Sequence, residues 1–204
     1  CTPEARKLRI AYLSADFHTH ATSYLIAELF ELHDRDRFEV LAVSFGPDDD
    51  GPLRKRIAAA VGQFVRVNDL SDPEVAALLV REQVDIAVDL KGFTRDSRPG
   101  IFLRRPAPIV VNYLGFPGTM GSACFDYIIG DPVVTPFEHA AFYSEKIVQL
   151  PHSYQVNDRK REIAPATPSR QLHGLPEACF VFACFNNNYK ITPAVFDVWM
   201  RRLG

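Results

Sequence analysis

Long hydrophobic runs are missing from this 204-residue sequence, and no apolar stretch approaches the ~18–20 residues needed to cross a bilayer. No apolar signal peptide opens it. Cysteine is also scarce: the four cysteines, at positions 1, 124, 179 and 184, form no Cys-x-x-Cys pair. This spacing argues against a disulfide framework or a zinc site, and favours buried reduced thiols in a cytoplasmic protein.

An excess of charge of either sign is absent as well. Lys and Arg total 23 against 25 Asp and Glu, a formal net charge of -2, which provides no basic face for nucleic acid. The basic runs 54–56 and 159–161 are short, and we expect each to be a solvated face. Methionine occurs only at positions 120 and 200 and the first residue is Cys1, so we expect a piece of a longer protein.

What the sequence does contain is an alternation of apolar, strand-like runs with amphipathic helices, which is typical of parallel βαβ units. We predict strands at 8–13, 38–45, 63–67, 84–90, 109–114, 126–130 and 146–150, and helices at 23–33, 52–61 and 71–83. In the first helix, Thr22 or Ser23 is the expected N-cap and Glu28 and Glu31 are expected to face solvent. Residues 1–150 are therefore predicted to form a doubly wound α/β domain.

The pattern changes after this domain. Residues 151–176 carry four prolines, mixed charges and no periodicity, so we interpret them as a linker. Residues 177–204 then begin again with an apolar run at 178–185, expected to be a buried strand, and a helix that starts at Thr192-Pro193. They are predicted to be the truncated start of a second α/β domain.

Ligands of doubly wound sheets bind beyond the carboxyl ends of the strands, which nominates the loop that follows the first predicted strand. This loop carries Asp16, His18, His20 and Thr22 just before a helix N-terminus, a position that favours anions such as phosphate. His20 can move a proton near neutral pH, and Asp16 can orient it. Two other interpretations stay open, a turn-capping Asp16 with an exposed His20, and a metal site on Asp16, His18 and His20.

Two further loops carry candidate residues. The loop 114–121 has glycines at 115, 118 and 121, but it lacks the tight G-x-G turn of a dinucleotide fingerprint and contains Pro117. Its glycines allow a ligand close to the backbone, although a plain turn is the alternative. Lys190 follows the apolar run 178–185 and can meet a diphosphate, while Asn187 offers amide groups to a polar ligand.

Asp-x-Asp patterns occur at 34–36 and 48–50, and metal-dependent sugar transferases use such pairs. The first lies at a predicted helix end beside an arginine and the second lies in a Gly/Pro-rich turn. We interpret both as solvated surface and expect no metal site.

Five segments together resemble the catalytic region of the O-linked N-acetylglucosamine transferases, glycosyltransferase family 41, in a bacterial form. They are LRIAYLSADFHTHATSYL (8–25), RPAPIVVNYLGFPGTMG (105–121), DYIIGDPVVTP (126–136), YSEKIVQLPHSY (143–154) and FACFNNNYKITP (182–193). The resemblance implies a GT-B architecture of two Rossmann-like domains, with the donor nucleotide held mainly by the second. It also implies inverting transfer of GlcNAc from UDP-GlcNAc to Ser or Thr hydroxyls, without a metal or other cofactor.

The resemblance also implies roles for individual residues. Asp16 and His20 match an essential Asp and His at the sugar–diphosphate site, and Lys190 matches the lysine that neutralises the departing UDP. Leu114, Gly115 and Pro117, with Thr22 nearby, are expected around the sugar. Asn187 falls where the animal enzymes carry a glutamine, which leaves its contact open.

The implied partners are a UDP-sugar donor, a protein or peptide acceptor, the rest of the C-terminal lobe and, in some family members, upstream tetratricopeptide repeats. Nucleic acid and membrane spans are not expected. Two alternatives remain, an N-glucosyltransferase that uses UDP-Glc and Asn acceptors, and a binding module without turnover. An NAD-binding domain is more distant because the G-x-G-x-x-G turn is missing. Since these residues carry only half of a two-domain cleft, we expect the fragment alone to be inactive.

Overall fold

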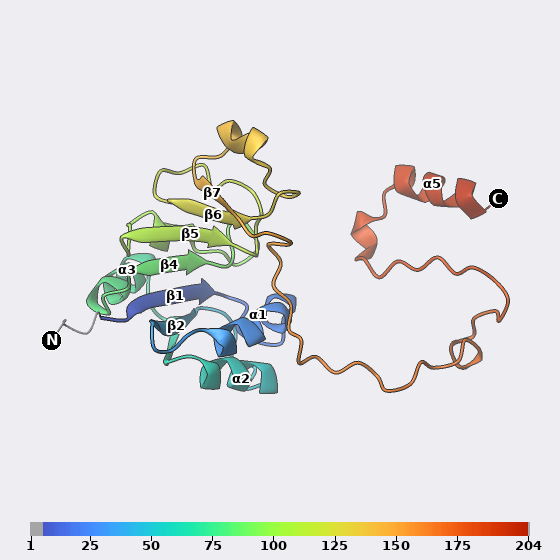
Figure 1. Cartoon of the computed structure of the whole chain (residues 1–204), viewed down its shortest axis with the longest axis horizontal. Coiled ribbons are helices and arrows are strands. Elements are labelled where there is room, and N and C mark those ends of the chain that lie inside the picture. The colour runs from blue at the N-terminus through green and yellow to red at the C-terminus, as the bar shows by residue number, and fades with distance from the viewer. Residues whose placement is uncertain (1–5, 204) are drawn as a thin grey trace. The chain divides into compact units, whose positions relative to one another are not determined.

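The computed structural model describes residues 6–203, which divide into two compact units, 6–161 and 162–203. The N-terminal unit is built on a sheet whose described strands all run parallel, in the order β3-β2-β1-β4-β5-β6-β7. The strands are β1 (Leu8–Ser14), β2 (Phe38–Ser44), β3 (Gln63–Arg66), β4 (Ile86–Asp89), β5 (Ile109–Tyr113), β6 (Tyr127–Gly130) and β7 (Lys146–Gln149). Figure 1 shows the arrowheads of β1, β4, β5 and β6 pointing the same way. The predicted doubly wound α/β domain is confirmed.

Both faces of the sheet are buried, because successive side chains of a strand point to opposite faces. In β1, Ile10 and Tyr12 belong to one apolar cluster, whereas Ala11 and Leu13 belong to the other. Helices α1 (Ala21–Leu32) and α2 (Pro52–Ala60) cover the first face, and α3 (Asp72–Arg81) with the short α4 (Pro99–Phe102) covers the second. The sequence did not predict α4, which is a single turn.

Helix α1 begins differently from the prediction. Its N-cap is His20, in an extended conformation, and the ring Nδ1 accepts the backbone N–H of Thr22 at 3.2 Å. The expected caps, Thr22 and Ser23, are instead buried in the first turn, where the Ser23 hydroxyl donates to the backbone carbonyl of Asp16. A histidine ring can supply the same acceptor that a Ser or Thr hydroxyl supplies at most helix starts.

The expectation of solvent exposure is wrong for Glu28 and for Arg54 of the first basic run, whereas residues 159–161 of the second run are exposed as expected. Glu28 is only 4% exposed, and its carboxylate accepts the backbone N–H of Arg159 at 2.7 Å and that residue's guanidinium at 3.0 Å. In the other run, Arg54 is buried and donates to the backbone carbonyl of Phe17 at 3.0 Å. Its guanidinium also lies over the Phe64 ring, 4.7 Å from the centroid. Residues of both runs thus form tertiary contacts with distant residues, which cannot be predicted from the charge pattern alone.

These contacts anchor the beginning of the segment interpreted as a linker. Tyr154 and Val156 pack against the α1–α2 face of the sheet, and the Tyr113 hydroxyl donates to the Tyr154 carbonyl at 2.9 Å. Asp158 is buried and forms a bidentate pair with Arg56 of α2. The N-terminal unit thus continues through Arg161.

Glu31 joins this network and predicts an acid-sensitive contribution to stability. Hydrogen bonds from Arg56 and then Lys160 lower its pKa from 4.5 to about 2. A carboxyl whose pKa is depressed by folding stabilises the native state above its unfolded pKa, and the contribution is lost as pH falls through the folded value. We expect wild type to melt higher than Glu31→Gln above about pH 5, with the difference fading between 4.5 and about 2. Thermal melts of both proteins across this range test it, and a difference that persists unchanged at the acid end would contradict it.

The C-terminal unit contains the predicted helix, α5 (Pro193–Leu203), together with the 3₁₀ turns η2 (Gln171–His173) and η3 (Asn188–Lys190). The strand expected at 178–185 does not form, and Cys179 and Cys184 are exposed, so the prediction that they are buried is wrong. A strand is stable only beside a hydrogen-bonding neighbour, and the described part of this unit contains no other strand. Within residues 6–203, no helix is both long and apolar enough to cross a membrane.

Candidate functional site

The order of the strands places a ligand site between β1 and β4. The chain winds outward from β1 to β3 on one side and from β4 to β7 on the other, so its direction reverses between these two central strands. Their carboxyl ends are aligned, since Leu13 is in register with Asp89. In open α/β sheets, ligands bind in the crevice at such a switch point. The loops that follow β1, β4 and β5 meet there.

Asp16 and Lys91 lie at the centre of this region. The Lys91 ammonium donates to both carboxylate oxygens of Asp16, at 2.7 and 2.9 Å, and the two residues are only 4% and 6% exposed, respectively. The Thr22 hydroxyl donates to the same carboxylate at 3.3 Å, and the Ser14 hydroxyl accepts the backbone N–H of Asp16 at 2.9 Å. Asp16 therefore connects the loop after β1 with the turn after β4 and with the first turn of α1.

His20 stands at the exposed side of this cluster, with 42% of its side chain accessible. Its Nδ1 accepts the Thr22 N–H and lies 3.6 Å from the nearer Asp16 oxygen, which is beyond hydrogen-bonding distance. In the neutral ring an accepting Nδ1 leaves the proton on Nε2. His20 is thus oriented by the backbone of α1, and it can offer an N–H to a ligand at the helix N-terminus.

The loop after β5 turns sharply against the turn after β4. Leu114 is buried and has a positive φ of 69°, unusual for a residue with a side chain. Gly115 follows, so close to the neighbouring loop that an added Cβ would lie 2.0 Å from the backbone oxygen of Leu90. Strained backbone of this kind clusters at functional sites, and here it brings the two loops together.

Buried side chains hold the rest of this loop, residues 116–120, through hydrogen bonds. Asn112, fully buried in β5, donates its amide N–H groups to the carbonyls of Phe116 and Gly118, at 3.0 and 2.9 Å. Pro117, between these two anchors, is exposed. Glu145 is also buried, and its carboxylate accepts from Met120 N–H and from the Thr119 hydroxyl. The loop is therefore pre-organised, with Pro117 presented to solvent.

Substitution of Gly115 tests this close approach. We expect Gly115→Ala to lower the thermal stability of the protein and to weaken nucleotide-sugar binding, because the new Cβ would collide with a backbone atom that has no room to yield. Thermal melts and donor titrations of the variant measure both effects. Gly62→Ala is the control, since a Cβ there has its nearest neighbour at 3.4 Å. If Gly115→Ala kept the melting temperature and the donor affinity of the wild type, the predicted steric clash would be wrong.

The structure thus gathers Asp16, His20, Thr22, Leu114 and Gly115 at one edge of the sheet, with Pro117 on the same group of loops. Lys190 and Asn187 belong to the C-terminal unit. There the backbone N–H of Lys190 donates to the Asn187 carbonyl at 3.0 Å, and both side chains are exposed.

Sequence reasoning assigned no role to two charged residues next to the site, Asp89 and Lys91. Asp89 lies in the predicted strand 84–90, and Lys91 directly follows that strand. Burial raises the pKa of Asp89 to about 6, and its carboxylate accepts the backbone N–H of Lys91 at 2.8 Å. The signal in the sequence was a lysine directly after an apolar strand, in Asp89-Leu90-Lys91, at the edge where ligands bind.

The carboxylates considered for metal binding have other partners. Asp48 pairs with Arg54 at 3.0 Å and Arg66 at 2.9 Å. Asp49 accepts the backbone N–H and hydroxyl of Thr19, which holds the pKa of its carboxyl down at about 2. Among residues 6–203, no three His, Cys, Asp or Glu side chains gather as a metal site.

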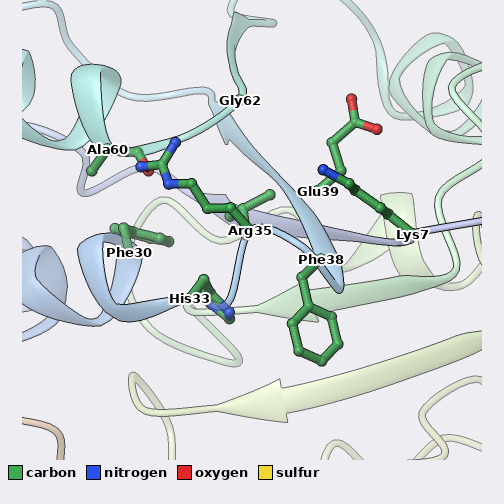
Figure 2. A pocket seen from close by; sticks show the side chains of 9 residues that line it. Lys7, Phe30, His33, Arg35, Phe38, Glu39, Ala60 and Gly62 are labelled. Atoms are coloured by element: carbon green, nitrogen blue, oxygen red, sulfur yellow. The ribbon is translucent and has the colours of Figure 1, made fainter.

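A separate pocket of about 250 Å³ lies away from these loops, near the amino ends of β1 and β2 (Figure 2). Two of its polar side chains, those of Arg35 and His33, already have partners within the protein. Arg35 donates to the Ala60 carbonyl at 2.8 Å, and the His33 ring shares a hydrogen bond with the Tyr12 hydroxyl at 3.0 Å. Burial also lowers the pKa of His33, which disfavours its cationic form. This pocket contains none of the predicted site residues.

The fold is a parallel α/β domain, and the N-terminus of α1 lies at the topological switch point of its sheet. A helix N-terminus at this position is suited to bind an anion. A family model described as glycosyl transferase family 41 matches residues 1–165, and the chain belongs to this family.

Curated proteins from plants and animals are similar to this chain. An Arabidopsis thaliana protein named "Probable UDP-N-acetylglucosamine--peptide N-acetylglucosaminyltransferase SEC" is 39% identical over 95% of the chain and 20% of its own length. The UDP-N-acetylglucosamine--peptide N-acetylglucosaminyltransferase of Caenorhabditis elegans is 32% identical over 79% of the chain and 14% of its own length. The chain thus spans about a fifth or less of these relatives.

Among solved structures, a lysine-to-methionine mutant of the O-GlcNAc transferase from Thermobaculum terrenum superposes with a TM-score of 0.84. It is 33% identical to this chain, and the match covers 97% of this chain and 36% of that one.

Proposed function

We propose that this chain is part of an inverting, metal-independent glycosyltransferase that moves GlcNAc from UDP-GlcNAc to Ser or Thr hydroxyls of proteins. The observation that carries the proposal is the cluster of Asp16, His20 and Thr22 at the N-terminus of α1, beside the switch point of the sheet. A helix start with free N–H groups suits a diphosphate. The names of the relatives supply the sugar and the peptide acceptor.

In the proposed mechanism, the acceptor hydroxyl attacks the anomeric carbon while the bond to the β-phosphate oxygen breaks, and UDP leaves with the electron pair. His20 donates its Nε2–H to the donor diphosphate and positions it, since Nδ1 is occupied by the Thr22 N–H. The proton of the acceptor hydroxyl passes to an oxygen of the donor phosphate. Thr22, Leu114, Gly115 and Pro117 surround the sugar, and glycine at 115 keeps the turn compact.

We also propose donor-binding roles for two residues of the C-terminal unit. Lys190 neutralises the negative charge that builds on UDP, as a positive group aimed at a leaving diphosphate does in other transferases. Asn187 offers an amide to the donor. We propose that residues 177–204 begin the second, nucleotide-binding lobe of a GT-B enzyme, and that residues 162–176 of the predicted linker 151–176 connect it to the N-terminal unit, which continues through Arg161. The fragment alone is expected to be inactive.

We further propose that the full-length protein is cytoplasmic, uses no cofactor besides its donor substrate and binds protein or peptide acceptors. Free thiols at Cys124, Cys179 and Cys184 are compatible with a reducing compartment. In this proposal, upstream tetratricopeptide repeats would supply further contacts to the acceptor.

A donor and acceptor matrix tests the function. Full-length protein is incubated with UDP-GlcNAc or UDP-Glc and with peptides that carry Ser/Thr or Asn acceptors, and the products are read by mass spectrometry. Transfer of GlcNAc to Ser or Thr supports the proposal. Glucose on Asn would instead identify an N-glucosyltransferase, and tight UDP binding with no transfer in any combination would identify a binding module.

A further inference from the structure

We infer that Lys91 is a positioning residue of the transfer reaction, which acts by holding the Asp16 side chain in place and thereby fixing the start of α1. This inference rests on the proposed function and extends it to a residue outside the site predicted from sequence. Its basis is the buried ion pair between the turn after β4 and the loop after β1.

The pair is buried on both sides and uses both oxygens of the carboxylate. Lys91 Nζ lies 2.9 Å from Oδ1 and 2.7 Å from Oδ2 of Asp16, and the two side chains are 5% and 9% exposed. Removing one partner of such a pair leaves the other charge buried without compensation, which costs far more than an exposed pair does. The Asp16 carboxylate would then move toward water.

A displaced Asp16 would disturb the first turn of α1, which carries Thr22 and orients His20. Its Oδ2 accepts the Thr22 hydroxyl at 3.3 Å, and its backbone carbonyl accepts the Ser23 hydroxyl, so it tethers the first turn of α1 twice. The backbone N–H of Thr22 in turn orients His20 through Nδ1. Lys91 is thus linked to His20 through Asp16 and Thr22, while its own ammonium is directed at a carboxylate.

The central position of Lys91 explains why a lysine is suited to this role. The β1–β4 register aligns Leu13 with Asp89, so Asp16 and Lys91 each follow the end of a central strand at the same edge. The backbone N–H of Lys91 donates to the Asp89 carboxylate, which fixes where its side chain starts. The long, flexible stem then spans the switch point to Asp16.

The experiment compares Lys91→Met, Asp16→Asn and the double variant in the full-length enzyme, with Lys91→Arg as the charge-retaining substitution. We expect Lys91→Met to lower kcat about 10²-fold, a size typical of a misplaced reacting group, and to change the affinity for UDP no more than Asp16→Asn does. The double variant should have the kcat of Asp16→Asn alone, because Lys91 acts through Asp16. It should also melt above Lys91→Met, since it buries no uncompensated charge. Lys91→Arg should recover part of kcat.

Lys55→Met is the matched control. Lys55 lies in α2, and its ion pair with Asp50 is exposed to solvent. It should retain wild-type kcat and melting. Weaker UDP binding by Lys91→Met than by Asp16→Asn would show direct contact with the donor and overturn the positioning role, as would an unchanged kcat or additive losses in the double variant. If the wild type transfers no sugar although the order of melting temperatures holds, the proposed function has failed, and the positioning role fails with it.

Discussion

Replacing His20 by Asn in the full-length enzyme is expected to lower kcat for GlcNAc transfer about 10²–10³-fold without lowering the melting temperature. Loss of one preorganised donor to developing charge has an effect of this size. Asn is among the best N-cap residues, so its side-chain oxygen can accept the Thr22 N–H that His20 Nδ1 now accepts. The substitution therefore separates the imidazole's chemistry from its role as the cap of α1.

His20→Ala provides the comparison, because it removes the ring and the cap together. We expect the same loss of kcat and, in addition, a loss of about 1 kcal/mol in the free energy of unfolding. Kinetics with UDP-GlcNAc and a Ser/Thr peptide, together with thermal melts, measure both quantities. Near-normal turnover by His20→Asn would show that this histidine only caps the helix.

Replacing Lys190 by Met in the full-length enzyme is expected to reduce transfer by about 10²–10³-fold, because the charge that stabilises departing UDP is lost. In the C-terminal unit the Lys190 side chain is exposed, and its backbone N–H, which Met retains, donates to the Asn187 carbonyl. The melting temperature should therefore change little, as it does for most exposed positions. Steady-state transfer and UDP affinity of wild type and variant check this.

Lys190→Arg should retain part of the rate, since it keeps a positive charge with a different shape. Lys55→Met serves again as the neutral control on an exposed lysine. If Lys190→Met turned over at the wild-type rate, Lys190 would have no part in the mechanism. It would then not be the group that neutralises the departing UDP.

Local patterns predicted most elements of the N-terminal unit correctly. The run Ser71-Asp72-Pro73-Glu74 predicted a helix start, and α3 begins there with a reciprocal capping box between Ser71 and Glu74. The apolar runs predicted every strand from β1 to β7, because buried parallel strands need apolar residues on both faces. These features depend on near neighbours in the chain, so the sequence alone contains them.

Features that depend on distant residues were predicted less well. Glu28 and Arg159 each look like solvated charges, yet they pair across 131 positions of the chain. The apolar run 178–185 looks like a buried strand, but it has no neighbouring strand within the described C-terminal unit. Burial and strand pairing require a partner, and a local pattern does not contain one.

The sequence by itself determined the class of fold, the loop that carries Asp16 and His20, and the resemblance to the family. Only the tertiary structure decided that the sheet places Lys91 against Asp16, and that His20 is turned by the Thr22 N–H instead of by Asp16. The reason is physical. Residue types and spacings state which groups are available, whereas the parallel register of β1 and β4 sets which of them share a buried, low-dielectric space.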